Sequence, residues 1–437
     1  MTVRRARKLP ADGATNGWYE TLPAPPPARR VEGSIDVEWA VVGAGICGLS
    51  VARRLGELRP DDRVALIDAE RLGYGTSGRN AGFLLKGHSH GGEKDFELGR
   101  RNDRLCAAGL EHIRDVVMRH QIQCDWSDWG RIYVANGAPG EIHLKHLADG
   151  LDGIGTAYTE VDRDGLEMVT GTRFYAKGIR ADGTALVQPA ALMRGLGTSL
   201  PPNVDLFEES PVTELHGGNG FRLVCADGEV AAKQVVLTNH VFAEEFGVAR
   251  HRVVPIALFA SLTRPLTSEE RTLVGGGGEF GLLPASPNGS TVRLTRDGRI
   301  LMRNTMGYAR AKRYAAAEME TAYANHREGI WRRWPDLAEI EFDGTWGGTL
   351  GFTRNGGVVF GEMAPGLHAV LTTDAAPLTR GAIAGRLLVE QICGRDSALL
   401  QDMLALPKAA WLPPDPVLRF VVSRRLRRNE TAEPSEL

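Results

Sequence analysis

The chain has 437 residues, of which 43% are hydrophobic and 24% are charged. This length is about three times that of a typical domain of ~150 residues, and the composition excludes the disordered, collagen-like and disulfide-scaffold classes. Lys and Arg number 52 against 54 Asp and Glu, so the chain has no net positive field to attract nucleic acid. We therefore expect a globular protein whose partner is a small-molecule substrate.

The sequence carries no sign of a membrane segment or a metal site. Its apolar runs are shorter than the ~20 residues that cross a bilayer, and the basic first residues are not followed by the apolar core of a secretion signal. Its five cysteines are scattered, without a C-x-x-C pair or the Cys/His spacing typical of zinc. We expect a cytoplasmic protein with reduced thiols and without a transmembrane segment.

Both ends of the chain are expected to lie outside the main folded body. Residues 1–35 contain the run TLPAPPPARR, whose prolines exclude helix and favour an extended arm. The arm includes Trp18 and Tyr19, which we expect to dock onto the body because aromatic rings are costly to leave in water. Residues 396–437 are expected to form a C-terminal tail.

The first strong pattern is a strand, a glycine-rich turn, a helix, a second strand and an acid. The apolar run Val37–Val42 predicts a buried parallel strand, and the apolar spacing from Ile46 to Leu58 predicts a helix. A second buried strand is predicted over Val64–Ile67, and Asp68 follows it directly. This order is typical of the first half of a dinucleotide-binding domain.

The turn reads G-A-G-I-C-G and has the chemistry of a pyrophosphate site. Gly43 makes the tight turn, Gly45 lets the backbone approach the pyrophosphate, and Gly48 permits close packing of helix on strand. The anion then meets the helix N-terminus at Ile46. Asp68 stands 20 residues after Gly48, where a carboxylate accepts hydrogen bonds from ribose hydroxyls and repels the 2′-phosphate of NADP. NAD and FAD both fit this pattern.

The next segment distinguishes the two cofactors. Residues 71–83 read RLGYGTSGRNAGF, which resembles the flavin loop of the D-amino-acid-oxidase superfamily, most closely the branch that contains gamma-glutamylputrescine oxidase. Similar segments run along the chain from residue 17 to about 420, among them GWYETLPAPPPAR, ALVQPAALMRGL, TVRLTRDGRILMRNT and TWGGTLGFTRNGGVVFGEMAPGLHAV.

The resemblance implies FAD and the oxidation of a carbon–nitrogen bond in an amine or an amino acid. Hydride transfer to flavin N5 would give an imine that hydrolyses, with electrons passed to oxygen or another acceptor. Together with the glycine pattern, it implies cofactor contacts at Gly43, Gly45, Ile46, Gly48, Asp68, Ala69, Ser77, Arg79, Asn80, Ala81, Gly82, Val212, Thr372 and Thr379.

We expect the FAD to be bound non-covalently. Neither histidine nor cysteine stands at the loop position where some relatives attach flavin, because the residues there are Ser77 to Asn80. Cys393 lies inside the last helical pattern and is interpreted as a packed thiol rather than an attachment point.

The predicted fold is α/β, with a Rossmann-like FAD-binding domain built from discontinuous segments and a substrate domain with a mixed sheet. The FAD domain is assigned to residues 36–90, 180–250 and 345–395. The substrate domain is assigned to residues 91–179 and 251–344.

The sequence departs from the family pattern at two places. Relatives carry a Gly-rich turn before the final helix, whereas residues 372–381 here read TTDAAPLTRG. Alanine and proline force a different backbone path there. Amino-acid-oxidising relatives such as glycine oxidase also place arginines on the substrate carboxylate, but the matching positions read GTLGFT at 348–353 and Asp374. An amine or a larger N-substituted compound therefore fits better than a simple α-amino acid.

Three groups are candidates for the chemistry, and a solvated-loop interpretation stands beside each. Lys86 and His88 follow the flavin loop and would act as a base or engage oxygen. Asp374 would pair with a substrate ammonium. The candidate substrate contacts are Arg303, Tyr308 and Trp346.

Two alternatives to an FAD oxidoreductase remain at this point. The altered turn at 372–381 leaves open a flavin-binding protein or subunit that has lost turnover. An NAD-linked dehydrogenase would share the glycine pattern, but the segment SGRNAG argues against it.

Overall fold

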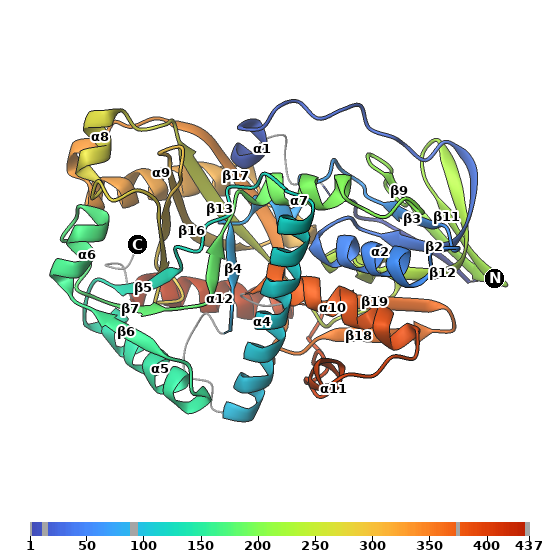
Figure 1. The fold of residues 1–437 in the computed structure, drawn as a ribbon. Helices are drawn as coiled ribbons and strands as arrows, with labels where there is room; N and C mark the ends of the chain where they lie inside the picture. The colour runs from blue at the N-terminus through green and yellow to red at the C-terminus, as the bar shows by residue number, and fades with distance from the viewer. Residues whose placement is uncertain (1, 11–15, 88–94, 373–375, 433–437) are drawn as a thin grey trace.

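The computed structural model describes residues 2–10, 16–87, 95–372 and 376–432. These residues form two large mixed sheets with helices packed against them and one two-stranded sheet of β4 (Phe83–Leu85) and β8 (Thr184–Leu186). The long helix α4 (Phe96–Arg119) lies between the two halves (Figure 1). The mixed α/β fold predicted from the sequence is confirmed.

The first sheet gathers strands from distant parts of the chain. Its order is β1 (Thr2–Arg5), β10 (Glu214–Gly218), β11 (Gly220–Val224), β12 (Gly228–Leu237), β2 (Gly33–Val42), β3 (Val64–Ile67) and β9 (Val204–Phe207). The end of β12 also pairs in parallel with β19 (Leu367–Leu371), which carries β18 (Val359–Ala364). In register, Val42 lies between Leu237 and Ile67, so the carboxyl ends of these parallel strands share one edge.

Helices α2 (Ile46–Leu58) and α10 (Pro377–Ile392) pack closely together beside this sheet. Glycine residues at the contacts allow the backbones of these helices to come close together. A Cβ on Gly385 would lie 2.5 Å from the carbonyl oxygen of Cys47, and a Cβ on Gly109 of α4 would lie 1.9 Å from that of Thr379. The remaining helices of this half are α7 (Pro189–Thr198) and α11 (Ala398–Leu404).

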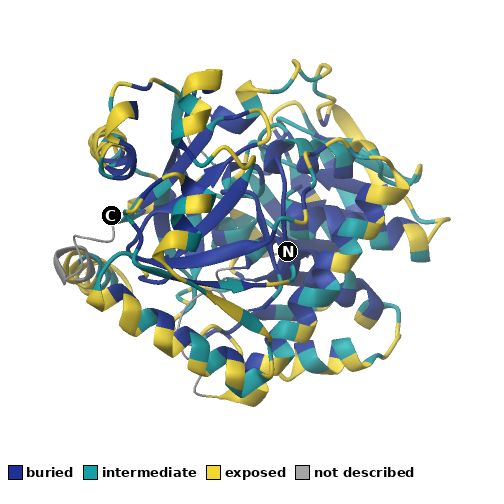
Figure 2. Cartoon of the chain, turned by 60° about the vertical axis from the view of Figure 1, so that its left-hand side comes forward, coloured by how far each residue is buried: buried dark blue, intermediate teal, exposed yellow. Residues whose placement is uncertain are grey.

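The second sheet has the order β17 (Phe342–Phe352), β13 (Val254–Thr263), β16 (Ile300–Tyr308), β15 (Thr291–Leu294), β14 (Phe280–Pro284), β5 (Arg131–Ala135), β7 (Lys177–Ala181) and β6 (Tyr158–Val161). Its strands are largely buried (Figure 2). Around it lie α5 (Ala138–Ile154), α6 (Arg163–Thr170), α8 (Ser268–Leu273) and α9 (Ala316–Arg333). Because β17 pairs with β13 up to Phe352, the second sheet extends past the boundary at residue 345 that the sequence suggested.

The N-terminal arm is fixed to the body at two places. Strand β1 pairs antiparallel with β10. The short helix α1 (Gly17–Glu20) buries Trp18, whose Nε1 donates to the carbonyl oxygen of Asn80 at 2.8 Å. The expected docking of Trp18 is therefore confirmed.

The C-terminal segment contains a further helix, α12 (Val417–Ala432).

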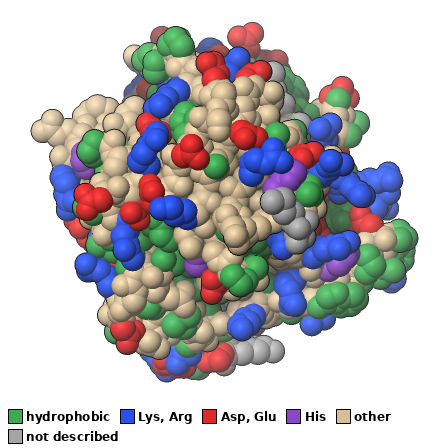
Figure 3. All heavy atoms as spheres, turned by 90° about the vertical axis from the view of Figure 1, so that its right-hand side faces the viewer, with side chains coloured by type: hydrophobic (Ala, Val, Ile, Leu, Met, Phe, Trp, Pro, Cys, Tyr) green, Lys and Arg blue, Asp and Glu red, His purple; other side chains and the backbone are tan. Residues whose placement is uncertain are grey.

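Acidic and basic side chains are interspersed on the face of the molecule shown in Figure 3. Within the described part of the chain, no helix combines the length and the apolar character needed to span a membrane.

Candidate active site

The glycine turn after β2 has the geometry that an anionic ligand needs. Gly43 adopts a φ of +102°, and a Cβ on Gly48 would lie only 1.8 Å from the carbonyl oxygen of Gly43. Helix α2 begins at Ile46, and its N-cap Gly45 provides no side-chain cap. The positive end of the helix therefore faces the turn, and its N-cap residue places no side chain in front of it.

Asp68, directly after β3, is held by the backbone of two turns. Its Oδ2 accepts from the N–H of Ala44 at 2.6 Å and its Oδ1 from the N–H of Glu70 at 2.9 Å. Burial raises the pKa of Asp68 to about 6, although these two N–H groups oppose the shift. The carboxylate is thus costly to bury and is positioned at the strand edge where a ribose would lie.

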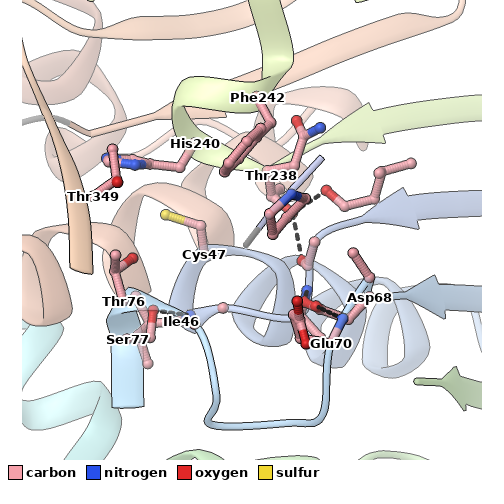
Figure 4. A pocket seen from close by; sticks show the side chains of 18 of the residues that line it. Ile46, Cys47, Asp68, Glu70, Thr76, Ser77, Thr238, His240, Phe242 and Thr349 are labelled. Carbon is pink, nitrogen blue, oxygen red and sulfur yellow. Dashed lines mark hydrogen bonds between the residues drawn. The ribbon is translucent and has the colours of Figure 1, made fainter. Parts of the chain in front are cut away.

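A first cavity of about 210 Å³ extends over these groups (Figure 4). The predicted cofactor residues that line it are Gly43, Gly45, Ile46, Asp68, Ala69, Ser77, Asn80, Val212 and Thr372. Ser77 also bridges the turn and the flavin loop, because its Oγ accepts from the N–H of Ile46 at 3.1 Å. The structure therefore brings residues from four separate segments to one elongated site.

Several residues of this cavity were not predicted. Thr238, Asn239 and His240 follow the carboxyl end of β12, and the edge shared by parallel strands is the signal that would have found them. Glu70 lies next to Asp68 (Figure 4). The arm residues Lys8, Leu9 and Pro10 also line the cavity, and no local sequence signal indicates this.

His240 presents a neutral imidazole to the first cavity. Its Nε2 accepts from the N–H of Gly351 at 3.3 Å, and burial lowers its pKa to about 4. Because Nε2 accepts, the proton of the neutral ring is on Nδ1, which is then a donor. Sequence reasoning gave His240 no role.

The flavin loop is braced from the second sheet. Arg79, the last residue of α3 (Thr76–Arg79), donates through Nε to the carbonyl oxygen of Tyr74 at 2.6 Å and through Nη1 to that of Gly347 at 2.8 Å. Trp346 donates from Nε1 to the carbonyl oxygen of Arg79 at 2.9 Å. These bonds fix the loop that forms a wall of the first cavity.

A second cavity of about 310 Å³ adjoins the first. Residues common to both linings are Thr76, Asn80, Leu350, Pro377 and Leu378. Of the predicted residues, Arg79, Ala81, Arg303 and Trp346 line this second cavity. Pro377 and Leu378 form the first turn of α10, which has no side-chain cap, so the positive end of that helix lies where the cavities meet.

The structure does not bring every predicted residue to the cavities. Thr379 is fully buried and its Oγ1 donates to the carbonyl oxygen of Leu85 at 2.7 Å, which makes it a packing residue of α10. The hydroxyl of Tyr308 donates to Asp415 at 2.8 Å instead of facing either cavity. These positions correct the expected cofactor contact of Thr379 and the expected substrate contact of Tyr308.

Lys86, Gly48 and Gly82 also lie outside both cavity linings. The stem of Lys86 packs against Gly183, so the predicted role of Lys86 as a base has no support from its position. A Cβ on Gly82 would lie 2.2 Å from the carbonyl oxygen of Val187, so this glycine, like Gly48, allows close packing. His88 and Asp374 lie outside the described residues.

Comparison with known proteins decides the family. The model of the family DAO, described as FAD dependent oxidoreductase, matches residues 38–391, which include most of both large sheets and most residues of both cavity linings. The chain belongs to this family. Its cofactor is FAD, as the sequence predicted, and the resemblance to the D-amino-acid-oxidase superfamily is confirmed.

Individual relatives have low sequence identity to this chain. The chain is 26% identical to a probable oxidoreductase OrdL of Rhizobium meliloti (strain 1021) over 407 residues, covering 89% of this chain and 91% of the relative. It is 24% identical to the gamma-glutamylputrescine oxidoreductase of Escherichia coli (strain K12), covering 84% and 86%. Its fold is similar to that of glycine oxidase from Geobacillus kaustophilus, with a TM-score of 0.71, 19% identity and coverage of 83% and 96%.

Proposed function

We propose that this protein oxidises a carbon–nitrogen bond of an amine or an N-substituted amino acid, using non-covalent FAD. FAD would supply a two-electron acceptor for hydride from the substrate α-carbon at its N5 position, and the imine so formed would be hydrolysed to a carbonyl compound and an amine. The observation that carries the proposal is the second cavity, which shares a wall with the FAD cavity.

The residues of the first cavity fit FAD. The N-terminus of α2, whose N-cap is the glycine Gly45, and the turn at Gly43 suit a pyrophosphate, and Asp68 suits a ribose. Thr76 and Asn80 border the end of this cavity that meets the second one, where the flavin ring would lie. At this junction the N-terminus of α10 would stabilise negative charge on the reduced ring.

The second cavity suits an organic substrate. Its lining is mainly apolar, including Phe83, Leu258, Leu283, Met306 and Phe352. Apolar walls lower the local dielectric constant and so strengthen the electrostatic interactions of the few polar groups among them. An open cavity beside the cofactor also supports turnover over the alternative of a flavin-binding subunit that has lost the reaction.

The ionisable side chains among the described residues of the second cavity affect the protonation state of the substrate amine. Their only ionisable side chains are Arg79 and Arg303, and both are cations. A protonated amine is disfavoured beside two guanidinium groups, and hydride loss from the α-carbon requires a neutral amine. The site therefore favours the neutral form of the substrate amine.

The relatives support the same class of reaction. One is named as a gamma-glutamylputrescine oxidoreductase, and a protein of similar fold is named as a glycine oxidase. These names cover an amine derivative and an amino acid, the two substrate classes between which the sequence does not decide.

The reaction step is tested by isotope substitution. An amine that reduces the flavin anaerobically should do so more slowly when its α-carbon carries deuterium, because the α-C–H bond breaks in that step. The product should be trapped as the corresponding carbonyl compound. Equal rates for the two isotopologues in the reductive step, with no carbonyl product, would contradict the proposed chemistry.

A further inference from the structure

Helix α12 is attached to the second sheet where it begins. The hydroxyl of Tyr308 on β16 donates to Oδ1 of Asp415 at 2.8 Å, and the same oxygen accepts from the N–H of Arg419 in the first turn of α12 at 3.2 Å. The helix and β16 are in contact (Figure 1). The position of α12 on the body is therefore fixed by the body itself.

One stripe of α12 faces that body. Leu418, Val422 and Leu426 are half-buried and follow one another at intervals of four residues. Residues four apart lie on the same side of a helix, so these three side chains form the packed stripe. The opposite side of the helix is turned away from the second sheet.

That opposite side carries apolar side chains that are left in water. Val417, Phe420 and Val421 are 54%, 67% and 54% exposed. Their spacing of three and four residues brings them together near the start of the helix. Single exposed apolar residues are ordinary, but a group of neighbours that includes an aromatic ring is typical of a binding surface.

Cationic side chains continue the same side of the helix. The sequence of α12 contains five arginines and a single acid, Glu430, although the net charge of the whole chain is −2. Arg424 stands four residues after Phe420, which places it one turn further along the exposed side. Arg424 and Arg425 are both exposed, and within the described part of the chain no carboxylate forms an ion pair with either.

A groove of about 700 Å³ follows this side of α12. Its described lining consists of Pro416 and six residues of the helix, among them Arg419, Phe420 and Arg424. No other described element contributes to the lining, so the aromatic ring and the guanidinium groups share one open space.

The size and the chemistry of this face decide between partners. Its 16 residues rise about 24 Å, and a face about 10 Å wide then offers roughly 240 Å², well below the ~800 Å² per partner of a stable protein interface. Pairing with α12 of a second copy would bring arginines against arginines. An anionic lipid surface offers negative headgroups and an apolar interior side by side, and it needs no larger complementary surface.

From this arrangement we infer that α12 is a membrane-surface helix that attaches the protein to anionic lipid. Val417, Phe420 and Val421 enter the interface, and the arginines that follow them contact the headgroups. The helix lies along the surface, and a single helix of this length gives reversible attachment. The inference goes beyond the proposed oxidation and does not depend on it.

Sedimentation with vesicles tests the attachment. The FAD-loaded protein is mixed with vesicles of phosphatidylserine and phosphatidylcholine, or with vesicles of phosphatidylcholine alone. We expect binding to the mixed vesicles and at least about 10-fold weaker binding to the neutral ones. Raising the salt concentration from ~0.1 M to ~1 M shortens the screening length from ~10 to ~3 Å and should weaken binding to the mixed vesicles.

Variants of α12 separate the charge from the apolar contact. Arg424→Gln combined with Arg425→Gln should weaken binding to the mixed vesicles about 30-fold, because each cation near an anionic surface contributes about a factor of five. Phe420→Ser should weaken it about 10-fold through the loss of apolar burial. All of these side chains are exposed, so the variants should keep their FAD.

Matched controls make the same changes elsewhere. Arg163→Gln combined with Arg395→Gln alters the net charge equally at two exposed arginines outside α12. Leu404→Ser removes an apolar side chain of α11 that is 47% exposed. Neither control should change the binding to vesicles.

The outcomes are distinct. Weaker vesicle binding in the α12 variants alone, with normal FAD content, supports the membrane-surface helix. Absence of binding to the mixed vesicles, equal binding to both kinds of vesicle, or an equal loss in the controls would overturn it. A dimer that Phe420→Ser dissociates, or an acidic protein bound through Arg424 and Arg425, in a protein that ignores vesicles would also overturn it and assign the face to that partner.

Discussion

The indole N–H of Trp346 and the carbonyl oxygen of Arg79 are 2.9 Å apart, although the two residues belong to different halves of the molecule. Trp346 is on β17 of the second sheet, and Arg79 ends α3 in the flavin loop. The guanidinium of Arg79 returns a bond to the carbonyl oxygen of Gly347 at 2.8 Å. This reciprocal pair joins the wall of the FAD cavity to the floor of the substrate cavity.

Trp346→Phe should weaken the attachment of the flavin loop to β17 while an aromatic ring still occupies the site of Trp346. The phenyl ring still fills most of the space against Gly17 and Trp18, but the hydrogen bond to Arg79 is lost. Loss of one such bond costs about 1 kcal/mol, so the dissociation constant of FAD should rise about 5-fold. The constant is measured by recovery of flavin fluorescence on dilution. Trp411→Phe, at a side chain that is 57% exposed, is the control, and an equal effect there would refute the role of the brace.

Gly48→Ala should prevent FAD from binding. The new Cβ would stand 1.8 Å from the carbonyl oxygen of Gly43, so either α2 or the turn must move away from the pyrophosphate position. We expect purified protein with little flavin and a loss of stability of more than ~2 kcal/mol. Gly277→Ala is the control, because its nearest neighbour would be 3.8 Å away. Normal flavin content in Gly48→Ala would show that the turn does not set the cofactor position.

Asp68→Asn should stabilise the FAD-free protein and weaken FAD binding. Burial raises the pKa of Asp68 from 3.8 to about 6, so the ionised carboxylate destabilises the folded state at pH 7, and this penalty vanishes as the pH falls below about 4. The variant should therefore be more stable by ~1–3 kcal/mol at pH 7 and by much less near pH 4. Its FAD dissociation constant should rise about 10-fold with the loss of a charged acceptor for ribose.

Chemical denaturation of the FAD-free proteins at the two pH values measures the first effect, and fluorescence titration with FAD measures the second. If Asp68→Asn and the parent protein differ in stability by the same amount at both pH values, then burial of the ionised Asp68 carboxylate is not the cause of the difference.

Removal of residues 2–10 should speed the dissociation of FAD. Strand β1 pairs with β10, Arg4 donates to the carbonyl oxygen of Phe246, and the N–H of Arg7 donates to Glu245, so the arm is held beside the lining residues Leu9 and Pro10. Loss of this apolar cover should raise the dissociation rate about 10-fold. None of the deleted residues 2–10 lines the second cavity, so KM should not change.

Deletion of residues 433–437 is the control for shortening the chain. An unchanged rate of FAD loss in the N-terminal deletion would mean that the arm only lies against the surface.

The nucleotide-binding half was predictable because its signals are local. The helix expected over Ile46–Leu58 and the strand expected over Val64–Ile67 have those bounds in the structure, since glycine spacing and apolar period are contained within some thirty residues. The position of Asp68 at the shared strand edge follows from the same pattern.

The rest depends on contacts that no local pattern encodes. Pairing of β1 with β10 joins residues more than 200 positions apart. Arg303 and Tyr308 both belong to β16 and pair with Ala260 and Ile256 of β13, but the hydroxyl of Tyr308 donates to Asp415 of the distant C-terminal segment, and only Arg303 lines the cavity. Thr379 was expected at the cofactor from its place near the helix start, yet one turn into α10 its side chain already points into the core.

The central claim is that the protein is an FAD enzyme reduced by an amine, and one measurement tests it most directly. The absorption spectrum of the purified protein is recorded before and after heat denaturation, and then during anaerobic addition of a panel of amines and amino acids. We predict flavin bands near ~375 and ~450 nm, full release of the flavin on denaturation, and bleaching by members of this panel. A flavin that stays with the denatured chain would contradict non-covalent binding, and a flavin that no amine or amino acid bleaches would contradict the proposed reaction.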